Sequence, residues 1–238
     1  MGLPNMFNDI IHKDLNVYAA WLPITQNYEL GDYGLISDGV FAKLGNIKEF
    51  GVTLNSTRGP NVSLDYTSAR TRVIKFAGGA EVDVIPAGAI DAKLSFKFET
   101  ANSFLIKCPV ISVNAITNVQ QVANQLLKVN EWRRAWKVVY ETYIAEDAVI
   151  MSTVDNDTEI SFNGDAKALK ELKIGTADIE FSSNKKLGLE IKGKDGVIAL
   201  GLFKLKLIGN GPVFLSDDEK KANAEIEDLR GKTLENDL

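Results

Sequence analysis

The residue types that most often carry out chemistry in proteins are scarce in this chain. His12 is the only histidine and Cys108 the only cysteine among 238 residues. A Ser-His-Asp or Cys-His arrangement would therefore need His12 itself, and the clustered His and Cys ligands of a zinc site are lacking. A lone cysteine forms no internal disulfide, which favours a reducing, cytoplasmic setting. The sequence predicts no catalytic residue, no metal site and no cofactor.

Neighbouring carboxylates are the remaining candidates for acid-base chemistry. They occur at Glu146-Asp147 and at Asp217-Asp218. Adjacent residues of a strand face opposite sides of a sheet, and both pairs are typical of turns or helix caps. A hydrolase whose carboxylates come from distant segments stays open as an alternative. The residues favour a protein that is not an enzyme.

Charge and composition narrow the class of partner. Hydrophobic residues make up 45% of the chain and charged residues 25%, which is typical of a folded domain. The net charge of −5 argues against a nucleic-acid partner, because binders of this size are usually basic. The acidity is concentrated at the C-terminus, where residues 216–238 hold eight acidic and four basic residues. No run approaches the roughly 18 apolar residues of a membrane-spanning helix, and the first residues lack the pattern of a signal peptide.

The spacing of apolar residues predicts an α+β protein with a twisted, largely antiparallel β-sheet and a few packed helices. An amphipathic helix is expected over residues 5–16, and a second from Thr117 to about Trp136. Residues 55–60 are expected to form a polar loop. The predicted strands are a hairpin around Asp38-Gly39, an alternating strand over 93–98, a strand over 104–113 in which Pro109 indicates an edge or a bulge, a hairpin joining 149–153 to 159–162, and an antiparallel pair within 187–207 that turns at Gly193–Gly196.

The Gly- and Pro-containing stretch after residue 208 and the helix start at Ser216 predict that the chain has three parts. Residues 1–208 form the β-rich body, 209–215 a linker, and 216–238 an acidic C-terminal helix and tail. The helix begins at the capping box Ser216-Asp-Asp-Glu219 and ends before Gly231. Its apolar stripe holds only Ala222, Ile226 and Leu229. Such a helix is either a solvated segment that aids solubility or a regulatory one.

The order of features from Ala92 to Val149 resembles the pore-forming domain of gasdermins. An amphipathic strand (KLSFKFET) is followed by a polar turn, a strand (FLIKCPVISV), a helix with Leu126-Leu127, and a strand that begins Lys137-Val-Val-Tyr-Glu-Thr. The N-terminal helix followed by Trp21-x-Pro23 and the late strands within 187–207 are also similar. Bacterial members often carry an acylated cysteine near the N-terminus, a feature that this chain lacks.

The resemblance implies a membrane pore-forming protein that its C-terminal segment holds inactive until a protease removes that segment. Its partners would be membrane lipids, the activating protease and further copies of itself, and it would move from the cytoplasm to a membrane. A non-catalytic cytosolic binding or structural protein is the alternative. The residues expected to act are Leu94, Phe96 and Phe98 on a lipid-facing strand, Arg58, Arg70, Arg72 and Lys75 toward anionic lipid, and Ile226 and Leu229 in the inhibitory helix.

Overall fold

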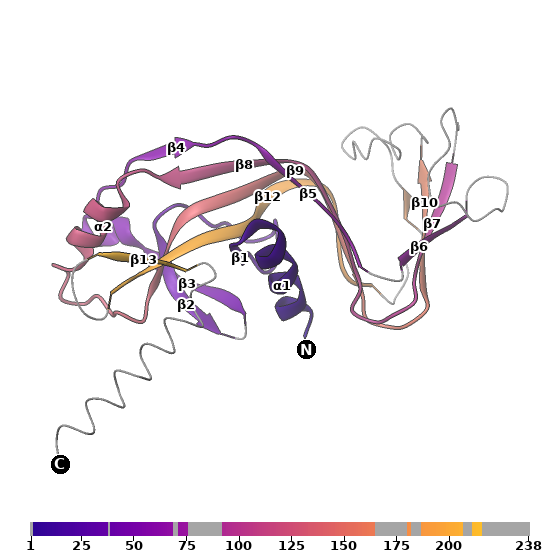
Figure 1. The fold of residues 1–238 in the computed structure, drawn as a ribbon, viewed down its shortest axis with the longest axis horizontal. Helices are drawn as coiled ribbons and strands as arrows, with labels where there is room; N and C mark the ends of the chain where they lie inside the picture. Colours follow the sequence, from indigo (N-terminus) through magenta and orange to yellow (C-terminus); the bar gives the residue numbers. More distant parts are fainter. Residues whose placement is uncertain are drawn as a thin grey trace, which may run out of the picture.

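Two antiparallel sheets, one large and one small, make up the fold of the chain (Figure 1). The computed structural model describes residues 2–37, 39–68, 71–75, 92–164, 180–181, 187–206 and 211–215. The C-terminal helix expected within 216–238 lies outside these residues. The α+β class with a twisted antiparallel sheet is confirmed.

Four long strands form the spine of the large sheet. They pair in the order β5 (Val62–Thr67), β8 (Phe104–Ile116), β9 (Lys137–Thr153) and β12 (Leu187–Leu205). The last two contain 17 and 19 residues, about three times the usual strand length. Short strands complete the sheet: β4 (Ser56–Arg58) on β8, the hairpin of β2 (Asp32–Ser37) and β3 (Val40–Asn46) on β9, and β1 (Tyr18–Ala19) with β13 (Pro212–Leu215) on the outer edge of β12.

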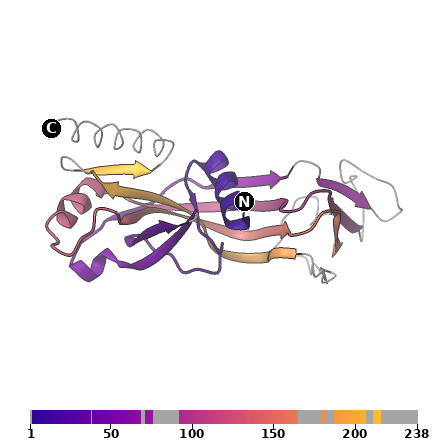
Figure 2. The same cartoon turned by 90° about the horizontal axis from the view of Figure 1, so that it is seen from below.

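The small sheet lies beyond one end of the large one (Figures 1 and 2). It contains β6 (Thr71–Lys75), β7 (Ala92–Phe98), β10 (Thr158–Gly164) and β11 (Glu180–Phe181). The alternating strand expected over 93–98 is β7.

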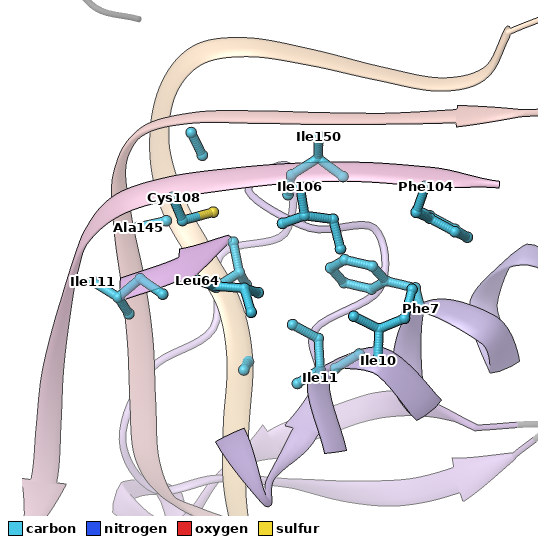
Figure 3. Close-up of a cluster of buried hydrophobic side chains, with 14 of the residues drawn as sticks. Phe7, Ile10, Ile11, Leu64, Phe104, Ile106, Cys108, Ile111, Ala145 and Ile150 are labelled. Atoms are coloured by element: carbon cyan, nitrogen blue, oxygen red, sulfur yellow. The ribbon is translucent and has the colours of Figure 1, made fainter. Parts of the chain in front are cut away.

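A crease crosses the large sheet. It lies where the hydrogen-bonded pairing of neighbouring strands is interrupted at the same height in β5, β8, β9 and β12. β8 bulges at Pro109–Val110 against β5, as the sequence predicts, and the pairing of β8 with β9 lapses at the same place. The ladder between β9 and β12 shifts on either side of Lys194. Asp147 adopts a left-handed backbone there (φ 52°), and its N–H donates to Asp195 Oδ1 at 2.9 Å. A bulge disrupts the regular pairing of a strand and allows the sheet to bend there. The strands turn sharply beside Cys108 and Ile111 (Figure 3).

Helix α1 (Leu3–Leu15) fills the inside of this bend (Figure 3). Pro4 sits in its first turn, where the missing N–H costs nothing, and Asn16 ends it in the left-handed conformation. Its apolar face packs against all the strands of the bend. The buried cluster contains Phe7, Ile10 and Ile11 of α1 with Leu64, Phe104, Ile106, Cys108, Ile111, Ala145, Ala148, Ile150, Ile198 and Ala199 of the sheet.

A second core lies under helix α2 (Val119–Leu126), around Tyr33 and the 3₁₀ turn η1 (Ile47–Phe50). The prediction that this helix reaches Trp136 was wrong, because it ends at Leu126. Trp132 and Trp136 instead follow it in a looped segment, and their rings lie 5.4 and 4.8 Å from that of Tyr33. Aromatic packing, rather than helical spacing, therefore explains their separation by four residues.

Four further predictions of local structure were wrong. Residues 149–153 and 159–162 do not pair with each other, because the chain passes there from β9 in one sheet to β10 in the other. Residues 187–205 form one continuous strand, so Gly193–Gly196 marks the crease and not a hairpin turn. The loop expected at 55–60 contains β4, and the linker expected at 209–215 contains β13. In the described part of the chain, no helix is long and apolar enough to cross a membrane.

The α1 contact gives a direct test of this packing. Phe7 is fully buried between Phe104 and Trp21, with ring centroids 5.9 Å from each. We expect Phe7→Ala to lower the free energy of unfolding by about 3–5 kcal/mol, because it removes an apolar side chain and leaves a cavity. Chemical denaturation measures the change. Leu44→Ala is the control, since Leu44 is 54% exposed and should stay within about 0.5 kcal/mol of the parent.

Candidate functional site

The four strands of the small sheet are continuations of the four central strands of the large sheet. Along the chain, β5 leads into β6, β7 into β8, β9 into β10 and β11 into β12. The order β5-β8-β9-β12 in the large sheet is therefore repeated as β6-β7-β10-β11 in the small one. The arrangement amounts to one four-stranded antiparallel ribbon, two long hairpins side by side, that is bent between the sheets (Figures 1 and 2).

Residue types alternate in register across the small sheet. Leu94 and Phe96 of β7 pair with Phe162 and Ile160 of β10, whereas the intervening positions pair polar residues with polar ones. β6 continues the alternation as far as Val73, which lies opposite Phe96, and its register shifts between Val73 and Lys75. Because positions two apart lie on one face of a strand, one face of the sheet carries the apolar positions and the other the polar ones. The polar pairs between β7 and β10 are Lys93 with Asn163, Ser95 with Ser161 and Lys97 with Glu159.

The structure separates the basic residues expected to act together. Arg72 and Lys75 lie on β6 of the small sheet, where they pair in register with Lys97 and Ser95. Arg58 lies on β4 of the large sheet, hydrogen-bonds Ser112 Oγ and pairs with Glu146 at 3.6 Å. Arg70 and the C-terminal positions Ile226 and Leu229 lie outside the described residues. Phe98, the last residue of the expected lipid-facing strand, is fully buried.

The hinge between the sheets comprises residues 99–103 and 154–157 together with Ser68. Four successive backbone N–H groups, those of residues 101–104, are all bonded there, and side-chain oxygens accept three of them. The bonds run from Ala101 N to Asn156 Oδ1 (2.7 Å), from Asn102 N to Thr153 O (2.8 Å), from Ser103 N to Thr153 Oγ1 (3.3 Å) and from Phe104 N to Ser68 Oγ (2.8 Å).

Further features mark the hinge as a departure from regular sheet. Asn102 and Asp157 adopt left-handed backbone conformations, with φ of 57° and 52°, which are sparsely populated by residues other than glycine. Ser103 Oγ donates to Thr100 O at 2.8 Å. Next to the hinge, Ser152 is fully buried, and its Oγ has no hydrogen-bond partner within the described part of the chain. Such an orphan hydroxyl costs the folded state about 1–3 kcal/mol.

The hinge and the crease differ in the free energy of the contacts that hold them. Opening the crease would uncover the α1 cluster, in which each fully buried Phe or Ile side chain contributes about 1.5–3 kcal/mol. Among the described residues, the hinge is bridged by hydrogen bonds that contribute about 0.5–1.5 kcal/mol each, and Phe98 adds one fully buried side chain. The hinge is therefore the weaker of the two bends. Sequence reasoning missed its residues, although the runs of short polar residues at 99–103 and 152–157 are a signal.

A polar group on β9 was also missed, although two of its residues, Tyr140 and Glu141, belong to the Val-Val-Tyr-Glu run of the sequence. Glu141 Oε2 accepts a hydrogen bond from Tyr143 at 3.2 Å. Burial raises the pKa of Glu141, and burial together with the charge of Glu141 raises the pKa of Tyr140 to about 12. Gly201 of β12 makes room for the carboxylate, since a Cβ there would lie 2.7 Å from Glu141 Oε2. Among the described residues, no group of three or more His, Cys, Asp or Glu could hold a metal ion.

The structure is similar to two solved proteins. One is a bacterial gasdermin from Bradyrhizobium tropiciagri, which covers 90% of this chain and 90% of its own at 14% identity, with a TM-score of 0.41. The other is the gasdermin A3 membrane pore, which covers 91% of this chain and 96% of its own at 9% identity, with a TM-score of 0.37. Both are gasdermins, the family that the sequence resembles. No family model and no curated protein matches the chain.

The half-buried carboxyl of Glu141 makes stability depend on pH in a defined direction. Because its pKa is raised on folding, the folded state holds the proton more tightly than the unfolded chain, whose Glu titrates near pH 4.3. Ionisation of Glu141 therefore lowers stability as the pH rises above about 4. We expect Glu141→Gln, which can still accept from Tyr143, to raise the melting temperature at pH 7.

The gain should shrink as the pH falls and vanish near pH 4, as measured by thermal unfolding at both values. Glu131→Gln, at an exposed residue, is the matched control and should leave the melting temperature unchanged at both pH values. An equal gain at pH 4 and pH 7 for Glu141→Gln would contradict the assignment.

Proposed function

We propose that the protein is a membrane pore former of the gasdermin type, and that the two-sheet arrangement is its resting conformation. In this proposal the bent ribbon straightens at the hinge, and the strands of the small sheet cross the bilayer. Several copies assemble side by side, because a single chain supplies only two hairpins. The chain acts through its surfaces and strands and not as an enzyme.

The repeated strand order carries this proposal. Straightening requires no exchange of neighbours, because each strand of the small sheet already lies between the same partners as its continuation in the large sheet. The two inner segments of the small sheet are long enough to span a bilayer. Residues 92–103 and 154–164 each match the roughly 9–11 residues that a tilted membrane strand needs.

The alternation of residue types in the small sheet supports a membrane partner. A spanning strand needs one apolar face toward lipid and one polar face toward water. The apolar positions Leu94, Phe96 and Phe98 of β7, with their partners on β10, would face lipid, and Lys93, Ser95 and Lys97 would face the pore. Phe98 is buried at rest, so its exposure to lipid would accompany the change in conformation. Arg72 and Lys75 of β6 lie in register with Lys97 and Ser95 on the polar face. With Arg70, they would meet anionic headgroups when the protein first binds the membrane, before the strands insert.

The C-terminal segment is proposed to hold the protein inactive in the cytoplasm until a protease removes it. Residues 216–238 follow directly after β13, which pairs with the outer edge of β12. Contacts of Ile226 and Leu229 would supply the inhibition. β13 itself belongs to the folded body, because Leu215 is buried in a core cluster with Tyr18 and Leu202. A cut after Leu215 would therefore release the segment and leave the core intact.

Truncation separates the inhibitory segment from the fold. We expect the chain truncated after Leu215 to release dye from anionic liposomes, while the full-length chain does not, because the segment that restrains the ribbon is gone. Truncation after Gly211 also removes β13 and should lower the melting temperature as well, since it uncovers the outer edge of β12. Fluorescence dequenching measures the leakage, with liposomes of neutral lipid as the control.

The pore proposal fails if neither truncated chain causes leakage or toxicity on expression in cells. That result would favour a non-catalytic binding protein. Leakage by the full-length chain equal to that of the truncated ones would instead overturn the inhibitory role of residues 216–238.

Neutralising charges on β6 tests the lipid contacts. We expect the double change Arg72→Gln and Lys75→Gln to weaken binding to anionic liposomes about thirtyfold, since each charge near such a surface contributes about 1 kcal/mol. Arg58→Gln is the matched control and should have little effect, because Arg58 lies on β4 and pairs with Glu146. Co-sedimentation with liposomes measures both. If Arg58→Gln weakened liposome binding as much as the double change on β6, the assignment of the lipid contacts to Arg72 and Lys75 would be contradicted.

A further inference from the structure

We propose that the side chains of Ser68, Thr153 and Asn156 form a latch that holds the ribbon bent and sets the rate at which it straightens. The inference deepens the proposed function and rests on it for its role in pore formation. It concerns the regulation of the hinge, and its first test needs no membrane.

The latch consists of three side-chain oxygens that accept backbone N–H groups. In a regular antiparallel ladder, backbone carbonyls accept the N–H groups of a strand. At residues 101, 103 and 104 the acceptors are instead Asn156 Oδ1, Thr153 Oγ1 and Ser68 Oγ. These oxygens come from two other segments of the ribbon, so the three bonds tie the β7–β8 junction to both of its neighbours.

Straightening exchanges these acceptors rather than destroying bonds. As residues 99–103 become continuous strand between β7 and β8, backbone carbonyls of the neighbouring strands take over the N–H groups of residues 101, 103 and 104. The same backbone N–H groups are then hydrogen-bonded in the bent and in the straight form. The two forms can therefore be close in free energy. The side-chain bonds must break before the ladder forms, so they contribute to the barrier. The left-handed backbone of Asn102 is strain of the bent form, because a residue of a continuous strand has negative φ.

Amide hydrogen exchange of the full-length soluble protein tests the latch directly. We expect Thr153→Val, which keeps the side-chain shape and removes Oγ1, to speed exchange at Ala101–Phe104 by about two- to tenfold, the effect of one lost hydrogen bond. Ser68→Ala and Asn156→Ala should act in the same direction. Thr142→Val is the matched control, because Thr142 is a buried threonine of β9 outside the hinge. Exchange in α2 reports any general loss of stability.

Asn102 supplies a second pair of variants with opposite expectations. Valine disfavours the left-handed conformation and favours strand, so Asn102→Val should speed exchange at the hinge. Glycine adopts positive φ without strain, so Asn102→Gly should leave exchange close to that of the parent. This pair separates the backbone requirement from mere loss of the asparagine side chain.

The same variants in the chain truncated after Leu215 connect the latch to pore formation. We expect Thr153→Val and Asn102→Val to shorten the lag before dye release, and Thr142→Val and Asn102→Gly to leave it unchanged. If Thr153→Val speeds amide exchange at the hinge but no truncated chain causes leakage, the latch proposal stands and the pore proposal fails. Leakage with identical exchange for Thr153→Val and Thr142→Val would overturn the latch and retain the pore.

Discussion

An antiparallel ladder can be bent sharply only where its hydrogen bonds are interrupted, and this constraint governs the whole structure. Strands of 17 and 19 residues are too long to lie in one compact body unbent. The four-stranded ribbon to which they belong is interrupted twice, once by bulges at the crease and once by side-chain acceptors at the hinge. The two devices differ in kind. The crease is filled by the apolar face of α1, whereas the hinge is closed largely by hydroxyl and amide groups.

This difference assigns separate roles to the two bends. The crease joins α1 to every central strand through buried side chains such as Phe7, Ile106 and Ile150, so it stabilises the body as a unit. The hinge leaves the strand order intact on both sides, and the contacts described across it are mainly hydrogen bonds. A protein that must remain folded while part of it changes shape needs both kinds of bend in the same strands.

Local patterns were enough to predict the strands but not how they connect. The alternation of β7, the bulge at Pro109 and the hairpin of β2 and β3 depend on neighbouring residues, and the structure confirms them. Asp155–Asp157 and Gly193–Gly196 have the composition of hairpin turns, yet they mark the hinge and the crease of continuous strands. Turn-forming residues also suit any abrupt change of strand direction, so sequence alone does not separate the two cases.

The candidate site shows the same division between local and distant information. The two-faced character of β7 was visible in the sequence, because it depends on residues two apart. The hinge was not, because the acceptors of residues 101–104 lie some 36 to 55 positions away in the chain. Hydroxyl-bearing residues are common in turns, and only the fold reveals which backbone groups they satisfy.

The bonds across the hinge also limit how the protein can diverge. Ala101 and Asn102 are tied to Asn156 and Thr153, so the segment before β8 and the segment after β9 are held in one register. An insertion of one residue in either segment alone would shift one strand against the other and exchange its two faces. Insertions and deletions at 99–103 and 154–157 should therefore occur together among descendants of this sequence, even though the two segments are encoded far apart.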